Sequence, residues 1–395
     1  MLLSAHAVRA KADDMFARAR NNRLEHWTLH LDALPACADY VAAVIRKRYP
    51  DLNVPFHARW RHFVFGGADL WATVRDGATW RDEHAQARAE FDLAITSVLL
   101  DAGAGGAWRY VDAASGVNAS RSEGLALASL RLFEWGGFSA DPVDPLRADA
   151  EALARFDAAE LADAFQVNER NPLSGLEGRA RLLNRLAAQV DARGDLFALD
   201  DKARPGGLYD ALRDRAPNRR VSARVILEVL LEALGPIWEN RPVLNGAPVG
   251  DCWPVDGIGL VPLHKLSQWL AYSLIEPLER AGICVTDIDG LTGLAEYRNG
   301  GLFIDMGVLV ARDAADLTRQ HNVSDAFVVT WRSLTIALLD CVAPLVRDRL
   351  GVSADQFPLA RVLEGGTWAA GRAIAREKRA DGSPPILIHS DGTVF

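Results

Sequence analysis

The sequence is poor in the residues that build disulfide frameworks and metal centres. Its 395 residues include only four cysteines, which are scattered and form no CxxC pair: Cys37, Cys252, Cys284 and Cys341. The nine histidines contain no HxH or HExxH arrangement, so the usual spacing of zinc ligands is missing. We therefore expect a reduced, cytoplasmic protein that uses no metal and no other cofactor.

Two further absences narrow the class of partner. No apolar run approaches the length of a membrane span, and the N-terminus carries charges too early for a signal peptide. Basic residues do not dominate either, because 52 acidic residues against 44 basic ones give a net charge of -8. Such a balance argues against a nucleic acid as the main partner. We expect no membrane association, and a small molecule rather than a polyanion as ligand.

Strand signals are also few, and the patterns predict a mainly α fold with a small β element near the C-terminus. Helical periodicity occupies most of the chain, whereas residues 240–260 look like a loop and residues 326–332 (AFVVTWR) like a short strand. An acidic, alanine-rich segment with Pro142 and Pro145 suggests a boundary. We expect an N-terminal helical lobe over residues 1–140 and a C-terminal lobe over 141–395 that carries the site, or one compact unit.

One stretch concentrates acids in an apolar setting. Residues 285–310 read VTDIDGLTGLAEYRNGGLFIDMGVLV and contain Asp287, Asp289, Glu296 and Asp305. A carboxylate among leucine, isoleucine and valine is costly to bury unless it is paired or used. The stretch is therefore the first candidate for chemistry, with Asp287 and Asp289 expected to position the turn that leads into it.

The segments before this stretch add polar candidates. Asp251 stands beside Trp253 in a glycine- and proline-rich turn, which suits the binding of a flat polar group, although turn formation explains an aspartate equally well. In the next predicted helix, His264, Gln268 and Tyr272 follow one another at intervals of four residues. That stripe, with Lys265 beside it, is either a pocket wall or a solvated face.

A glycine-rich loop and a histidine pair favour structural explanations. The loop from Gly103 to Gly106 follows a helix and lacks the lysine of a phosphate-binding loop, so a helix-ending turn is the simpler interpretation. His57 and His62, five residues apart, do not share a helix face well. An aromatic cluster around Trp60 is expected there rather than a metal site.

Several motifs together resemble a known family. They are residues 175–179 (GLEGR), 260–272 (LVPLHKLSQWLAY), 291–307 (LTGLAEYRNGGLFIDMG) and 390–395 (SDGTVF). They are similar to the uracil-catabolism protein family of fungi and bacteria, formerly a domain of unknown function. This resemblance implies a place in a pathway that converts uracil, through a nucleotide, into ribosylurea and then urea.

A more distant resemblance bears on mechanism. The queuosine salvage proteins cleave the N-glycosidic bond of a modified nucleoside monophosphate, and they carry a Lys-x-x-Gln helix, an Asp-Ile-Asp segment and an Ala-Asp-Tyr-Arg motif. Lys265 and Gln268 match the helix, residues 287–289 match the segment, and residues 295–298 match the last motif. The resemblance implies a helical core related to DNA glycosylases. One departure is that Glu296 stands where that family has its catalytic aspartate.

The resemblance implies a metal-independent N-ribosyl hydrolase that acts on a nucleoside or nucleotide, namely ribosylurea or its 5′-phosphate. Breaking the C1′–N bond develops oxocarbenium charge, which a nearby carboxylate stabilises. Glu296 is the first candidate for that carboxylate and Asp305 the second. The expected substrate contacts are Asp251, Trp253, His264, Lys265, Gln268, Tyr272, Tyr297 and Arg298.

Structural alternatives stay open for the main candidates. Glu296 and Arg298 could form a plain ion pair, Lys265 could be exposed, and Asp305 could bond backbone amides at the Gly300–Gly301 turn. Two other functions also compete. One is an amide or ring-opening hydrolase on a uracil-derived nucleotide, which lacks visible zinc ligands or a nucleophile. The other is a non-catalytic nucleotide-binding protein.

Overall fold

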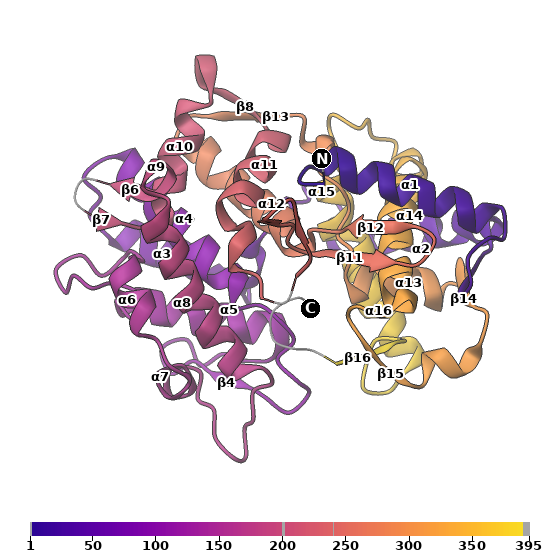
Figure 1. Ribbon diagram of the computed structural model, residues 1–395, viewed down its shortest axis with the longest axis horizontal. Helices are drawn as coiled ribbons and strands as arrows, with labels where there is room; N and C mark the ends of the chain where they lie inside the picture. The colour runs from indigo at the N-terminus through magenta and orange to yellow at the C-terminus, as the bar shows by residue number, and fades with distance from the viewer. Residues whose placement is uncertain (1, 200–201, 240, 390–395) are drawn as a thin grey trace. The chain divides into compact units, whose positions relative to one another are not determined.

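The computed structural model describes residues 2–199, 202–239 and 241–389 (Figure 1). Helices make up most of it, and the strands occur only as short two-stranded pairs. The predicted mainly α class is confirmed, and β16 (Leu387–His389) supplies the small β element near the C-terminus. The closing motif at residues 390–395 lies outside the described residues, and the likeness to DNA glycosylases stays a prediction.

The chain divides into two units at positions that differ from the predicted boundary near residue 140. Unit 1 comprises Met1–His57, Asp251–Gln268 and Asp287–His389, and unit 2 comprises Ala58–Gly250 and Trp269–Thr286. The N-terminal and C-terminal segments belong together because α1 (Ala5–Arg20) and α2 (Leu34–Arg48) both pack on α14 (Ala326–Leu350). The segment with Pro142 and Pro145 lies inside unit 2.

Unit 1 is a helical body with three strand pairs. Besides α1, α2 and α14, its helices are the start of α12 (Lys265–Arg280), α13 (Tyr297–Asp305), α15 (Leu359–Arg361), the π-helix η8 (Val362–Thr367) and α16 (Trp368–Lys378). Two strand pairs are antiparallel, β1 (Trp27–Leu29) with β14 (Leu309–Ala311) and β11 (Cys252–Val255) with β12 (Gly259–Pro262). The third pair, β15 (Gln320–Asn322) with β16, is parallel.

Helix α14 is the core of unit 1. It is apolar on nearly every side, and α1, α2 and α13 pack against it, as Figure 1 shows for the indigo α1 and the orange α14. The strand predicted at residues 326–332 is wrong, because this run forms the first turns of the helix. A short apolar run has the same pattern in a buried strand and a buried helix, and packing decides between them.

Length and composition would also let α14 cross a membrane. Of the helices in the described part of the chain, it alone meets both criteria, but 83% of its most apolar window is buried inside the protein. A helix that is hydrophobic all round and covered by other helices is a core helix.

Unit 2 contains the remaining helices and five strand pairs. Its helices are α3 (Leu70–Gly77), α4 (Glu83–Leu99), α5 (Arg121–Glu134), α6 (Ala150–Arg155), α7 (Ala158–Ala164), α8 (Leu176–Ala192), α9 (Gly194–Phe197), α10 (Leu208–Asp214), α11 (Ala223–Leu234) and the larger part of α12. The antiparallel pairs are β2 (Val64–Phe65) with β3 (Ala68–Asp69), β4 (Tyr110–Val111) with β5 (Asn118–Ala119), β6 (Ala198–Leu199) with β7 (Lys202–Ala203), and β9 (Val243–Leu244) with β10 (Ala247–Pro248). The parallel pair is β8 (Arg220–Ser222) with β13 (Cys284–Thr286).

The loop predicted at residues 240–260 instead contains the β9–β10 hairpin and most of the β11–β12 hairpin. Between β9 and β10, Asn245 and Gly246 have φ angles of 52° and 80°. Two successive left-handed residues make the turn that matches the twist of a hairpin, and Asn-Gly is its strongest sequence signal. That signal is present in the sequence, and the surrounding glycine and proline residues obscured it.

Carbonyl groups at the start of the loop from Gly103 to Gly106, and just before it, face an arginine. The buried guanidinium of Arg179 donates hydrogen bonds to the carbonyl oxygens of Leu100, Ala102 and Gly103. A phosphate-binding loop would instead point its N–H groups at the ligand. The geometry fits the predicted helix-ending turn.

The aromatic cluster predicted near Trp60 is present in unit 2. The Trp60 ring lies 5.9 Å from that of Phe63 and 6.1 Å from that of Trp71, measured between centroids. His62 belongs to the same unit and packs edge-on against Trp269.

The contact between α13 and α16 generates a prediction about stability. A Cβ atom on Gly371 would lie 2.1 Å from the carbonyl oxygen of Arg298, which belongs to the backbone of α13 and cannot rotate away. We expect Gly371→Ala to lower the free energy of unfolding by about 1–3 kcal/mol, measured as a lower midpoint in urea.

The matched control is Gly77→Ala, because nothing lies within 4 Å of a Cβ at that position. Its midpoint should stay close to that of the parent protein. Equal midpoints for both variants would show that α13 and α16 do not pack as closely as described.

Candidate functional site

A buried ion pair between Asp251 and Arg332 lies at the centre of the polar residues of unit 1. Arg332, on α14, donates one hydrogen bond to each oxygen of the Asp251 carboxylate, at 2.9 and 2.8 Å. Asp251 precedes β11, and Arg332 is 1% exposed. A paired, two-pronged contact of this kind is the strongest arrangement available to an arginine and a carboxylate.

Two more donors complete the environment of Asp251. The indole N–H of Trp253 donates to one oxygen at 2.7 Å, and the backbone N–H of Lys265 donates to the other at 3.1 Å. A carboxylate has about four lone-pair positions, and these four N–H groups fill them. These bonds use both Asp251 oxygens and the Trp253 N–H to join β11 to α12 and α14, and the substrate contacts predicted for the two residues stay predictions.

The charge of Asp251 is strongly favoured in the folded protein. Burial alone would raise the pKa of the carboxyl group, but the charge and hydrogen bonds of Arg332 outweigh it and hold the pKa well below its usual value. The neighbouring His264 is buried too, and burial lowers the pKa of its imidazole against the opposing pull of Asp251. Asp251 and Arg332 therefore form a charged ion pair with a structural role.

Arg332 also connects this pair to the predicted catalytic segment. Its Nε donates to the carbonyl oxygen of Ala295 at 3.1 Å. Ala295 directly precedes Glu296, so one guanidinium fixes both the β11 side of the site and the backbone at the candidate carboxylate.

Glu296 is the N-cap of α13. Its two carboxylate oxygens accept hydrogen bonds from the backbone N–H groups of Arg298 and Asn299, each at 2.6 Å, and the residue is 6% exposed. Capping satisfies N–H groups that the first helical turn leaves without partners, and the helix dipole favours the negative charge. The Glu296 carboxylate accepts these two hydrogen bonds and keeps lone pairs for a further contact. The Asp251 carboxylate, with four donors, does not.

Tyr297 and Arg298 follow Glu296 in the first turn of the same helix. The guanidinium of Arg298 lies 5.0 Å from the centroid of the Tyr297 ring, and its Nη1 donates to the carbonyl oxygen of Gly382 at 2.9 Å. Arg298 is buried and Tyr297 is half-buried. Both remain predicted substrate contacts. The bond to Gly382 also means that Arg298 helps to hold the start of α13 in place.

Asp305 is the last residue of α13 and lies far from Glu296. Nine residues of helix separate them by roughly 13 Å, at about 1.5 Å a residue. Both oxygens of Asp305 accept from Arg379, at 2.8 and 2.6 Å. This ion pair replaces the predicted bonds to backbone amides, and one C1′ atom cannot contact both acids. Asp305 therefore does not fit the role of a second carboxylate beside Glu296.

The turn before α13 is held by Asp289, as predicted for a positioning residue. Its carboxylate accepts from Arg347 at 2.7 Å and from the backbone N–H of Leu359 at 2.5 Å. Asp287 has a left-handed backbone, with φ at 54°, which aspartate tolerates better than most residues.

The predicted stripe on α12 is buried rather than solvated. His264, Gln268 and Tyr272 are at most 1% exposed, and Lys265 is buried as well. The Oε1 atom of Gln268 accepts from the backbone N–H of Thr292 at 3.3 Å, which places it beside the catalytic candidate segment. Tyr272 belongs to unit 2, whereas the other three belong to unit 1.

Sequence reasoning missed three residues that the structure places around Glu296. Arg332 and Trp331 lie on α14, in the run whose pattern predicts a strand, and Asn299 lies in the first turn of α13. A Cβ atom on Gly300, the residue after Asn299, would lie 2.6 Å from atoms of the Trp331 indole. An arginine within an apolar run was the one signal that could have revealed Arg332.

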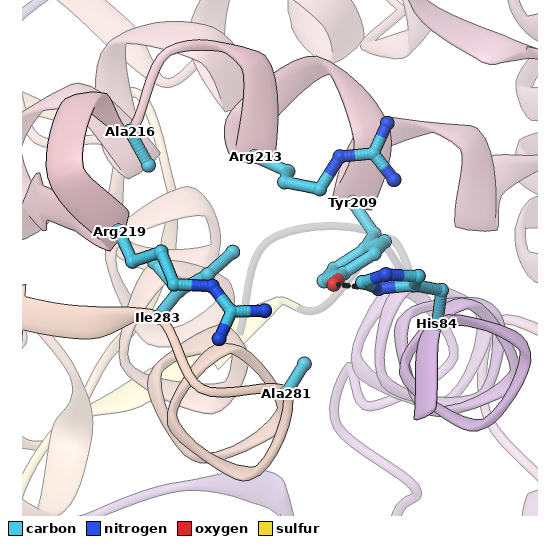
Figure 2. Close-up of a pocket in the computed structure, with 7 residues that line it drawn as sticks. All are labelled: His84, Tyr209, Arg213, Ala216, Arg219, Ala281 and Ile283. Atoms are coloured by element: carbon cyan, nitrogen blue, oxygen red, sulfur yellow. Dashed lines mark hydrogen bonds between the residues drawn. The ribbon is translucent and has the colours of Figure 1, made fainter. Parts of the chain in front are cut away.

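A small pocket in unit 2 is a separate feature. Figure 2 shows Tyr209 and His84 joined by a hydrogen bond, with Arg213 next to Tyr209 and Arg219 across the pocket. The hydrogen bond measures 2.7 Å. The pocket's volume of about 40 Å³ has room for about three water molecules. It is too small for a nucleoside, because ligand pockets usually measure several hundred Å³.

Comparison with known proteins identifies the family. A family model described as "Protein of unknown function (DUF1688)" matches residues 1–395. The chain belongs to this family. Two curated members are similar along their whole length. Protein urg3 of Schizosaccharomyces pombe is 36% identical over 410 residues, covering 100% of this chain and 98% of that protein. Uracil catabolism protein 4 of Lachancea kluyveri is 35% identical over 433 residues, covering 99% and 98%. The first resemblance drawn from the motifs is thereby confirmed, and the one to queuosine salvage proteins stays a prediction.

The ion pair between Asp251 and Arg332 generates a prediction with a pH dependence. We expect Asp251→Asn to cost about 3–5 kcal/mol of unfolding free energy at pH 7, because it leaves the buried guanidinium without its counter-charge. The pKa of Asp251 is depressed in the folded state, so its contribution is present above the unfolded value of about 3.9 and is lost as the pH falls further. The difference between the two proteins should shrink below about pH 4, as measured by urea unfolding.

Asp289→Asn is the control, since the Asp289 side chain is 40% exposed and its ion pair is on the surface. It should cost at most about 1 kcal/mol. An Asp251→Asn protein as stable as this control at pH 7 would contradict a structural role for the buried pair.

Proposed function

We propose that this protein is an N-ribosyl hydrolase of uracil catabolism, which cleaves ribosylurea or its 5′-phosphate into urea and ribose or ribose phosphate. The name of the relative from Lachancea kluyveri, Uracil catabolism protein 4, supports the pathway. The reaction itself rests on the chemistry of the site. Water adds its hydroxyl to C1′, the C1′–N bond breaks, and the proton of the water ends on the urea nitrogen.

The proposal rests mainly on the burial, fixed orientation and position of the Glu296 carboxylate. The carboxylate is buried, held in one orientation by two backbone N–H groups, and located at the positive end of the α13 dipole. These contacts fix the carboxylate before substrate binds, so that little reorganisation is needed when charge develops.

Such a carboxylate suits a transition state with positive charge on the sugar. As the C1′–N bond lengthens, the ribose acquires oxocarbenium character, which a negative group in a dry site stabilises far better than water does. The same carboxylate can orient the attacking water through a lone pair that the helix does not use. Asp251 has no lone pair to spare, and the Asp305 carboxylate lies at the other end of the helix.

A single assay separates this proposal from its competitors. The purified chain is incubated with ribosylurea, ribosylurea 5′-phosphate and UMP, and released urea, ammonia and free sugar are measured. Urea together with ribose or ribose phosphate supports the proposal. Ammonia or a ring-opened product without free sugar points to an amide or ring-opening hydrolase, and tight binding without turnover points to a non-catalytic protein.

The role of Glu296 is tested by Glu296→Gln. The amide keeps the shape of the side chain but removes the charge, so we expect kcat for urea release to fall by about 10²–10³, the usual loss when one electrostatic contact is removed. The variant also weakens the helix cap, at a cost of about 1 kcal/mol. Circular dichroism and the urea midpoint report that second effect separately.

Asp149→Asn is the matched control for loss of a cap. Asp149 is a buried N-cap in unit 2 that also accepts from two backbone N–H groups, those of Ala140 and Ala152. It should lose stability and keep its kcat. A Glu296→Gln protein with full turnover would remove Glu296 from the mechanism.

A further inference from the structure

We infer that Gln268 and Asn299 form a donor–acceptor pair that recognises the ureido group of the substrate. The inference deepens the proposed function and rests on it for the identity of the substrate. A ureido group presents a carbonyl oxygen next to an N–H group. The pair offers one side-chain N–H donor and one side-chain carbonyl acceptor, which is the complementary pattern.

Both amides are wholly buried, and each has one end without a partner. Gln268 and Asn299 are both 0% exposed. Within the described part of the chain, the Nε2 atom of Gln268 and the Oδ1 atom of Asn299 have no hydrogen-bond partner. A buried polar atom left in this way destabilises the folded protein. Two such atoms near one segment call for an explanation, and a ligand supplies it.

The backbone determines which end of each amide is free. The Oε1 atom of Gln268 accepts from the N–H of Thr292 at 3.3 Å, so its NH₂ group must face the other way. The Nδ2 atom of Asn299 donates to the carbonyl oxygen of Leu294 at 3.3 Å, so its Oδ1 atom is the free end. Turning either amide over would set two donors or two acceptors against each other. The free donor and the free acceptor are therefore distinct.

Both amides hold the segment that leads into the candidate carboxylate. Thr292 and Leu294 lie four and two residues before Glu296, and Asn299 also gives its backbone N–H to the Glu296 carboxylate. A further donor lies close by. The Nε1 atom of Trp331 has no partner among the described residues, and its neighbour Cε2 would lie 2.6 Å from a Cβ on Gly300.

This arrangement would act on the leaving group while Glu296 acts on the sugar. When the C1′–N bond breaks, the electron pair moves onto the urea nitrogen and partly onto the urea carbonyl oxygen. A hydrogen bond from Gln268 to that oxygen stabilises the developing negative charge. An N–H group of the ureido moiety donates to Asn299 and fixes its orientation.

The test uses Gln268→Glu and Asn299→Leu, each combined with Glu296→Gln so that ligand is not consumed. Gln268→Glu keeps the acceptor for Thr292 and replaces the free donor with an oxygen, so the hydrogen-bond pattern at that end is reversed. Calorimetric titration with ribosylurea should give about tenfold weaker binding or more for either variant. Binding of ribose should be unchanged.

Gln189→Glu is the matched control, because the Nε2 atom of Gln189 already donates to the carbonyl oxygen of Ala233 in unit 2. It should bind ribosylurea as the parent does. If both test variants bind ribosylurea as tightly as the parent, or lose ribose binding equally, the inference is overturned. If one variant fails to fold by circular dichroism, the other carries the test.

Failure of the proposed function gives a different result. Suppose that the unmodified protein releases no urea from ribosylurea, but both test variants bind ribosylurea selectively more weakly. The ureido site would then stand and the hydrolase would be rejected. If the unmodified protein releases urea but the variants bind ribosylurea normally, the hydrolase would stand and the ureido site would be rejected.

Discussion

The rest of the site depends on one buried ion pair. Arg332, on the core helix α14, donates two hydrogen bonds to Asp251, and its Nε donates a third to the carbonyl oxygen of Ala295. Three separate parts of unit 1 are joined by this one guanidinium, and a planar fork of five donors is the side chain that can do so. Burying it requires a fully bonded partner. Asp251, with four donors on two oxygens, meets that requirement.

The acids of the chain therefore differ in what they have left to offer. Asp251 has every lone pair occupied, Asp305 is held by Arg379, and Asp289 ties a turn to α14 and α15. Of these four acids, only Glu296 combines burial, fixed orientation and unused lone pairs next to unpartnered amide groups. Burial and apolar surroundings are common to several of these carboxylates. A structural carboxylate is therefore distinguished from a catalytic one by the number of hydrogen-bond donors that already occupy its lone pairs.

Much of the fold could be predicted from local pattern, since long amphipathic helices such as α4 and α8 carry their own periodicity. The region around residues 285–310 could also be singled out, because acids in an apolar run are unusual. The role of Asp251 could not be predicted, since its partner lies 81 residues away in a run that resembles a strand. Asn299 was missed for a related reason. An asparagine near a glycine pair is typical of a turn, and only packing shows that it is buried.

The length of the Glu296 side chain bears on the predicted resemblance to the queuosine salvage proteins, whose motif has an aspartate at the matching position. Short side chains usually serve as N-caps, because they reach the N–H groups of the first turn without strain. Here the longer glutamate reaches them too, with one oxygen on Arg298 and the other on Asn299. The carboxylate of this longer side chain therefore lies at the start of α13. Its position depends on the helix that it caps, and that helix is held against α14, where Trp331 leaves room only for glycine at position 300.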